Sequence, residues 1–120
     1  MIIKKVQNID VIDGEEGTEI RQIFHPHNTL NGIRYSISHS ELKAGKKSKL
    51  HQLKSSEVYY ILQGEGKLHV DEEVLEISKD QVIYIPPQSK QCIENTGKDL
   101  LKFLCIVDPA WKQEDEVVLE

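Results

Sequence analysis

The sequence has few cysteines, few aromatic residues and no long apolar run. Cys92 and Cys105 are too few for a disulfide framework, and their spacing fits no zinc motif. Spanning a bilayer takes about 20 consecutive apolar residues, and no segment approaches that length. The N-terminus carries Lys4 and Lys5 and then polar residues, where a signal peptide would have an apolar core. We therefore expect a cytoplasmic protein that does not bind membranes.

Basic residues are also fewer than acidic ones. The chain has 15 Lys and Arg against 20 Asp and Glu, which gives a net charge of -5. Nucleic-acid binding usually needs a basic stripe, so a nucleic acid is not an expected partner. A length of 120 residues is that of one ordinary domain, and we assign residues 1–120 to a single domain.

Helix signals are scarce, because no segment of a dozen residues shows a capped i, i+3, i+4, i+7 apolar pattern. Short runs rich in β-branched and aromatic residues alternate instead with turn residues, of which Asn31-Gly32 is one signal. An acidic tail covers 113–120. Such spacing predicts an all-β sandwich or barrel. The expected strands are 2–6, 19–24, 33–42, 50–63, 67–70, 74–77, 81–85, 91–94 and 100–107.

Two of these segments are apolar on both faces. Residues 58–62 and 100–107 lack the alternation expected of a strand with one wet face. One face can line a barrel, and the other needs a further layer or a second subunit. We therefore expect a homodimer, in which the strands of residues 1–30 pack on their own barrel or on the partner.

One group of polar residues recurs at a characteristic spacing: Gly45, His51, Glu57 and Gly64. A second follows 16 residues after Gly64 and comprises Asp80, Pro86, Gln91 and Asn95. Together they resemble the two motifs of the cupin superfamily. Leu53 stands where the first motif has its second histidine. In the second motif Asp80 and Gln88 replace glycines, and Gln91 replaces a histidine.

The resemblance implies a small single-domain cupin of the cupin 2 type, an antiparallel jelly-roll β-barrel with a conserved core over about residues 33–108. In that family the motif side chains bind one metal inside the barrel. Carried over by position, His51, Glu57 and Gln91 are the candidate metal ligands. His25, which with His27 flanks Pro26, is a candidate for a further imidazole. The implied cofactor is a divalent ion such as manganese, iron, zinc or nickel.

Residue parity supports a polar site inside the barrel. His51, Glu57 and Tyr59 share parity, so an unbroken strand points all of them to one face. A buried glutamate is costly without a partner, and a metal, His51, Gln91 or Tyr59 can serve. Glu57 and Tyr59 are the candidate catalytic residues. Without a metal, His51 and Glu57 form an acid–base pair, and Gln91 and Tyr59 hydrogen-bond a small-molecule ligand.

Three functions stay open. The first is a metal-dependent enzyme of isomerase, dioxygenase or decarboxylase type acting on a small oxygenated substrate. The second is a non-catalytic, metal-free cupin that binds a small ligand. The third, a regulatory module, has the least support, because it usually accompanies a DNA-binding domain. Trp111 is expected to cover one barrel end or part of a subunit interface. Cys105 is expected to pack in the core.

Overall fold

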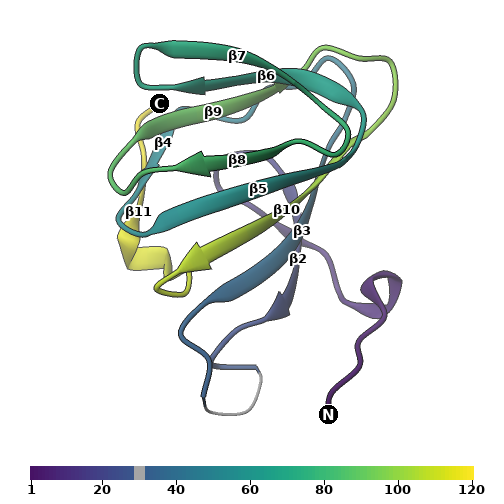
Figure 1. The fold of residues 1–120 in the computed structure, drawn as a ribbon, viewed down its shortest axis with the longest axis vertical. Helices are drawn as coiled ribbons and strands as arrows, with labels where there is room; N and C mark the ends of the chain where they lie inside the picture. The colour runs from purple at the N-terminus through teal and green to yellow at the C-terminus, as the bar shows by residue number, and fades with distance from the viewer. Residues whose placement is uncertain (29–31) are drawn as a thin grey trace.

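The computed structural model describes residues 1–28 and 32–120 as two antiparallel sheets that face each other (Figure 1). The first sheet has the order β1 (Ile12–Asp13), β2 (Glu19–Phe24), β3 (Ser36–Leu42), β10 (Leu101–Asp108), β5 (Ser56–Gln63) and β8 (Val82–Ile85). The second has the order β11 (Glu116–Val118), β4 (His51–Leu53), β9 (Lys90–Asn95), β6 (Glu65–Val70) and β7 (Glu73–Ser78).

After β3 the chain passes repeatedly from one sheet to the other, interrupted only by the β6–β7 hairpin. This is the jelly-roll arrangement, so the all-β barrel prediction is confirmed. The helical elements are two 3-10 turns, η1 (Val6–Asn8) and η2 (Gln113–Asp115). Within residues 1–28 and 32–120, no helix is long and apolar enough to cross a membrane. The strands β1 and β2 pair with each other, and β2 pairs with β3 of the same chain.

Three details of the sequence prediction are corrected. Residues 2–6 form no strand, since no neighbouring strand pairs with them and η1 begins at Val6. The segment 50–63 is two strands, because the chain crosses from the second sheet to the first at a bend at Lys54 and Ser55. The acidic tail contains β11, which pairs with β4. Of the expected Asn31-Gly32 turn, Asn31 lies outside the described residues.

The core lies between the two sheets. Register rows such as Ser40–Phe103–Ile61 and Ser38–Cys105–Tyr59 run across the inner face of the first sheet. Leu68 and Ile93 pair on the inner face of the second sheet. A buried cluster joins both faces: Leu42, Tyr59, Ile61, Leu68, Ile77, Ile85, Ile93, Leu101, Phe103 and Cys105. The apolar parity of these strands therefore determines which side of each sheet is closed.

Two of the substituted motif glycines sit at turns that favour glycine. Asp80 has φ 70° and Gln88 has φ 69°, both in the left-handed region. Their amides are nonetheless used, since Asp80 N–H donates to Ile61 O and Gln88 N–H donates to Leu53 O. Gly64, at φ 91°, is more constrained, because a Cβ there would lie 2.8 Å from Leu100 O. The motif spacing thus reflects backbone requirements of the barrel.

We predict that substitution of Asn95 strongly lowers the stability of the fold. Its Nδ2 donates to Leu42 O at 2.9 Å and to Asp99 O at 2.8 Å, and its Oδ1 accepts from Gly97 N–H. Asn95→Ala leaves buried backbone groups unpaired, so we expect a loss of about 2–4 kcal/mol in unfolding free energy. Urea denaturation measures it. The exposed neighbour Thr96→Ala is the control, and equal effects of both variants would contradict this role.

Candidate functional site

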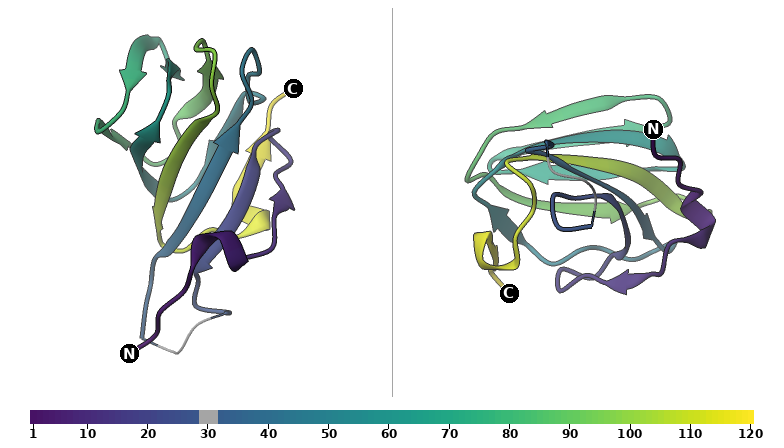
Figure 2. Two further views of the ribbon diagram at one scale, coloured as in Figure 1. Left: turned by 90° about the vertical axis from the view of Figure 1, so that its right-hand side faces the viewer. Right: turned by 90° about the horizontal axis from the view of Figure 1, so that it is seen from below.

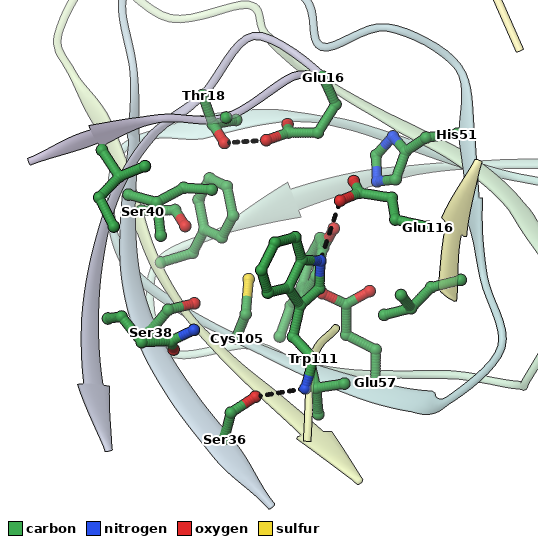
Figure 3. Close-up of a pocket in the computed structure, with 18 of the residues that line it drawn as sticks. Glu16, Thr18, Ser36, Ser38, Ser40, His51, Glu57, Cys105, Trp111 and Glu116 are labelled. Atoms are coloured by element: carbon green, nitrogen blue, oxygen red, sulfur yellow. Dashed lines mark hydrogen bonds between the residues drawn. The ribbon is translucent and has the colours of Figure 1, made fainter. Parts of the chain in front are cut away.

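A cavity of about 140 Å³ lies between the sheets (Figure 3). The C-terminal segment and the strand β1 run along the same side of the barrel in the ribbon views (Figure 2). Its walls come from β1, β2, β3, β5 and β10 on one side and from β4, β9 and β11 on the other. The apolar part includes Ile20, Leu53, Ile93, Phe103 and Val107. The polar part includes Glu16, Thr18, Gln22, Ser36, Ser38, Ser40, His51, Glu57, Tyr59, Cys105 and Glu116.

His51 reaches the cavity from β4. Its neighbour Gln52 is more exposed, because side chains alternate along the strand, while His51 itself is only 6% exposed. The His51 Nδ1 atom lies 2.7 Å from Lys49 O. A carbonyl only accepts, so Nδ1 donates this hydrogen bond. Among the described residues no hydrogen bond engages Nε2, and the His51 side chain lines the cavity.

Glu57 and Tyr59 point inward from β5, where they oppose Val107 and Cys105 of β10. Gln91 comes from β9 in the opposite sheet and joins them. Gln91 Nε2 donates to Glu57 Oε1 at 2.9 Å, and Tyr59 OH donates to Gln91 Oε1 at 2.8 Å. Tyr59 also packs against Phe103, with ring centroids 5.2 Å apart. The structure therefore joins Glu57, Tyr59 and Gln91 by hydrogen bonds, and His51 lines the same cavity as Glu57 and Tyr59.

Burial controls the proton affinity of the site. It raises the pKa of Glu57 from 4.5 to about 7, partly opposed by the Gln91 hydrogen bond and the charge of His51. Burial likewise raises the pKa of Glu16, although its hydrogen bond from Thr18 acts the other way. The pKa values of Tyr59 and Cys105 lie well above their ordinary values for the same reason. With a pKa of about 7, the Glu57 carboxyl exchanges a proton near neutrality.

His25 lies away from the cavity lining. Its Nε2 lies 2.7 Å from Trp111 O, and its Nδ1 accepts the N–H of His27 at 3.1 Å. Both ring nitrogens are thus engaged in holding the C-terminal segment. Of the weaker candidates, His39 and His69 lie on outward faces of β3 and β6, beside Leu104 and Cys92. The structure brings neither to the cavity.

The side chains do not fit the metal centre that the resemblance implies. The amide oxygen of Gln91 already accepts a hydrogen bond from Tyr59, and its NH₂ group, which only donates, faces Glu57. Leu53, which lines the cavity, has no ligating atom. Across residues 1–28 and 32–120, no three His, Cys, Asp or Glu side chains are grouped so that they could hold a metal ion.

Two glutamates of the site were not anticipated. Glu16 lies in the loop before β2 and is buried, and Glu116 is on β11 (Figure 3). Glu16 accepts from Thr18 OH at 2.6 Å, and Glu116 accepts from Trp111 Nε1 at 2.9 Å. Their sequence surroundings are charged and typical of surface loops. A weak signal existed in the short apolar run 117–119, which is typical of a strand.

The fold and the motif positions agree with a known family. The family profile described as the cupin domain matches residues 38–107. The chain belongs to the cupin family. An uncharacterised protein of Methanocaldococcus jannaschii is 39% identical over 107 residues, covering 88% of this chain and 85% of that protein.

More distant relatives are larger or share the fold alone. A mannose-1-phosphate guanylyltransferase of Salmonella montevideo is 27% identical over 120 residues, covering 96% of this chain and 26% of the enzyme. The chain thus spans about a quarter of that relative. A Thermotoga maritima structure described as a predicted oxalate decarboxylase is 24% identical, with a TM-score of 0.78 and coverage of 90% of this chain and 99% of that one.

The raised pKa of Glu57 predicts a pH-dependent stability. The folded state holds a proton between pH 4.5 and about 7 that the unfolded state has released, so stability falls as pH rises through that window. Glu57→Gln removes this cost. Relative to the parent, we expect the variant to gain little at pH 4 and on the order of 3 kcal/mol at pH 8.

Urea unfolding between pH 4 and 8 measures this difference. The exposed Glu76→Gln on β7 is the control and should follow the parent at every pH. A gain by Glu57→Gln that does not vary with pH would show that Glu57 titrates normally in the folded protein.

Proposed function

We propose that this cupin binds a small molecule in its barrel without a metal, and that Glu57 exchanges a proton with that molecule. The observation that carries the proposal is the bond from Gln91 Nε2 to Glu57 Oε1, made at the position where the resemblance expects a metal-ligating histidine. The neutral Gln91 amide donates to one carboxyl oxygen of Glu57 and adds no charge. Burial is therefore the main influence on the pKa of the Glu57 carboxyl. The carboxyl is 7% exposed and faces the cavity.

The neighbouring groups have distinct roles in this proposal. Tyr59 and Gln91 act as positioning residues, because the Tyr59 hydroxyl is committed to Gln91 and the Gln91 amide to Glu57. The Glu57 carboxyl, with a pKa of about 7, can donate or accept a proton at neutral pH. His51 Nε2 can accept a second hydrogen bond from the ligand. Among the expected reaction classes, isomerisation by proton transfer is the one these groups perform unaided.

The sugar phosphate in the name of the guanylyltransferase relatives does not suit the lining of this cavity. A sugar phosphate needs cationic side chains or several N–H donors around its phosphate. No Lys or Arg lines the cavity, and its walls carry acidic side chains instead. We therefore do not propose mannose 1-phosphate as the ligand of this site.

The free, buried thiols of Cys92 and Cys105 suit a reducing cytoplasmic setting.

Metal content and ligand binding together test the proposal. Protein purified without added metal should contain only substoichiometric metal, and it should bind fragment-sized ligands in EDTA, as detected by saturation-transfer NMR. Leu53→Trp, which fills the cavity, should abolish that binding, whereas Val74→Trp on the exposed face of β7 should not. Stoichiometric metal that is lost in His51→Ala would overturn the proposal in favour of a metal-dependent cupin.

We also propose that a second copy of the chain covers the outer face of the first sheet. Tyr84 and Val82 pair there with Val58 and Tyr60, and Leu104 pairs with Tyr60 from β10. These side chains are uncharged, so the face can meet an identical face without opposing charges. The strand β8 also ends the sheet, which leaves one of its backbone edges without a partner strand among the described residues.

Matched charge substitutions test the dimer. Val82 is 60% exposed on the proposed interface, and Val74 is 54% exposed on the other sheet. Val82→Glu should shift the sedimentation coefficient from that of a dimer toward that of a monomer, because a buried unpaired carboxylate is costly. Val74→Glu should leave the dimer intact. A monomeric parent protein, or equal effects of both variants, would contradict this interface.

A further inference from the structure

Carboxylates from separate segments converge on the cavity that we propose as the ligand site. Each accepts a side-chain hydrogen bond: Glu16 from Thr18 OH, Glu57 from Gln91 Nε2, and Glu116 from Trp111 Nε1. Figure 3 shows Glu16 and Glu116 on the same side of the cavity as His51, with Glu57 below the Trp111 indole. We call Glu16, Glu57, Glu116 and His51 the acceptor ring.

The protein leaves acceptor capacity unused in the ring. Glu116 Oε1 receives no hydrogen bond from the described residues. The Glu57 carboxyl has, besides the Gln91 amide, the Cys105 thiol as a weak donor. No ion pair within 4.0 Å joins His51 to any of these carboxylates in the described parts of the chain.

Two observations beyond the acidic side chains point to a ligand. His51 is 6% exposed and lines the cavity, and no hydrogen bond from the described residues engages its Nε2. Gln22 Oε1, which also belongs to the cavity lining, is buried with no hydrogen-bond partner. An unsatisfied buried acceptor is costly, so a ligand that brings donors gains more here than one that brings acceptors.

The charge of the cavity lining narrows the chemical class of the ligand further. Asp13 joins the glutamates in the lining, and no Lys or Arg does. A primary ammonium group offers three N–H donors, no acceptor and a positive charge. The indole of Trp111 at the same end offers a face that attracts cations. An alcohol has a single donor and no charge, and a carboxylate or phosphate would add to the negative charge.

The size and the lining of the cavity limit the hydrocarbon part of the ligand. A volume of about 140 Å³ is close to the roughly 150 Å³ cavity that holds one benzene molecule. Beyond the acceptor ring, the walls are apolar and include Ile93, Phe103 and Val107. A compact ligand of about six or seven non-hydrogen atoms in all therefore fits the cavity.

We propose that the ligand of this cavity is a small primary amine, with its ammonium group at the carboxylates of the acceptor ring and its hydrocarbon part against the apolar side chains. This inference rests on the proposed function, because it takes the cavity as a ligand site. The lining supplies both carboxylates and apolar side chains. An amphipathic cation matches both.

Isothermal titration of the full chain in EDTA with probes of similar shape tests the amine. Cyclohexylamine should bind at least about tenfold more tightly than cyclohexanol, and cyclohexanecarboxylate should not bind measurably. Glu116→Gln keeps an acceptor for Trp111 and should weaken cyclohexylamine binding about tenfold. The exposed Glu114→Gln in the same segment is the matched control and should have no effect.

The outcomes separate this inference from the proposed function. Cyclohexanol binding as tightly as cyclohexylamine, lost in Leu53→Trp, would overturn the amine while the cavity remained a ligand site. Equal effects of Glu116→Gln and Glu114→Gln would also overturn it. Saturable binding of Mn²⁺ or Zn²⁺ alone in EDTA-free buffer, abolished by Glu116→Gln, would replace the amine with a metal and overturn both proposals. Absence of binding by every probe would overturn the amine as well.

Discussion

The site depends on one amide that bridges the two sheets. Gln91 from β9 is 1% exposed, and it donates to Glu57 while accepting from Tyr59, both on β5. Without it, a carboxyl and a phenol would be buried between the sheets with unmet hydrogen bonds. A neutral side chain meets those needs without bringing a charge. The carboxyl therefore keeps the elevated pKa that burial imposes, and its proton remains exchangeable near neutral pH.

The same bridge explains how a family scaffold can change its chemistry while keeping its shape. The left-handed turn at Gln88 and the hydrogen-bonded turn at Asn95 still flank β9, so position 91 still points into the barrel. Only the side chain there differs from the histidine that the resemblance expects. Together with Leu53, this removes ligating atoms from the interior, and carboxylates contributed by the terminal segments change the cavity's charge.

The terminal segments complete the site. The loop before β2 supplies Glu16, and the C-terminal segment supplies Trp111 and Glu116. These segments contact each other through Gln113 Nε2 and Glu15 Oε1, and β11 is fixed to β4. His25, expected as a metal ligand, instead holds the backbone of Trp111. Parts of the chain outside the conserved motifs thereby decide what the cavity can bind.

The sequence by itself determined the all-β class and the inward parity of His51, Glu57 and Tyr59, because alternation and motif spacing are local properties. It placed Gln91 beside Glu57 but gave it as a metal ligand, where the structure has a hydrogen-bonded amide. It did not reveal Glu16 or Glu116, because both lie in charged segments that are typical of a solvated surface. The burial of Glu16 and the partial burial of Glu116 follow from the loop before β2 packing over the barrel and from the pairing of β11 with β4. Only the tertiary structure decides such contacts between distant segments, since their stabilisation exists only once the barrel has formed.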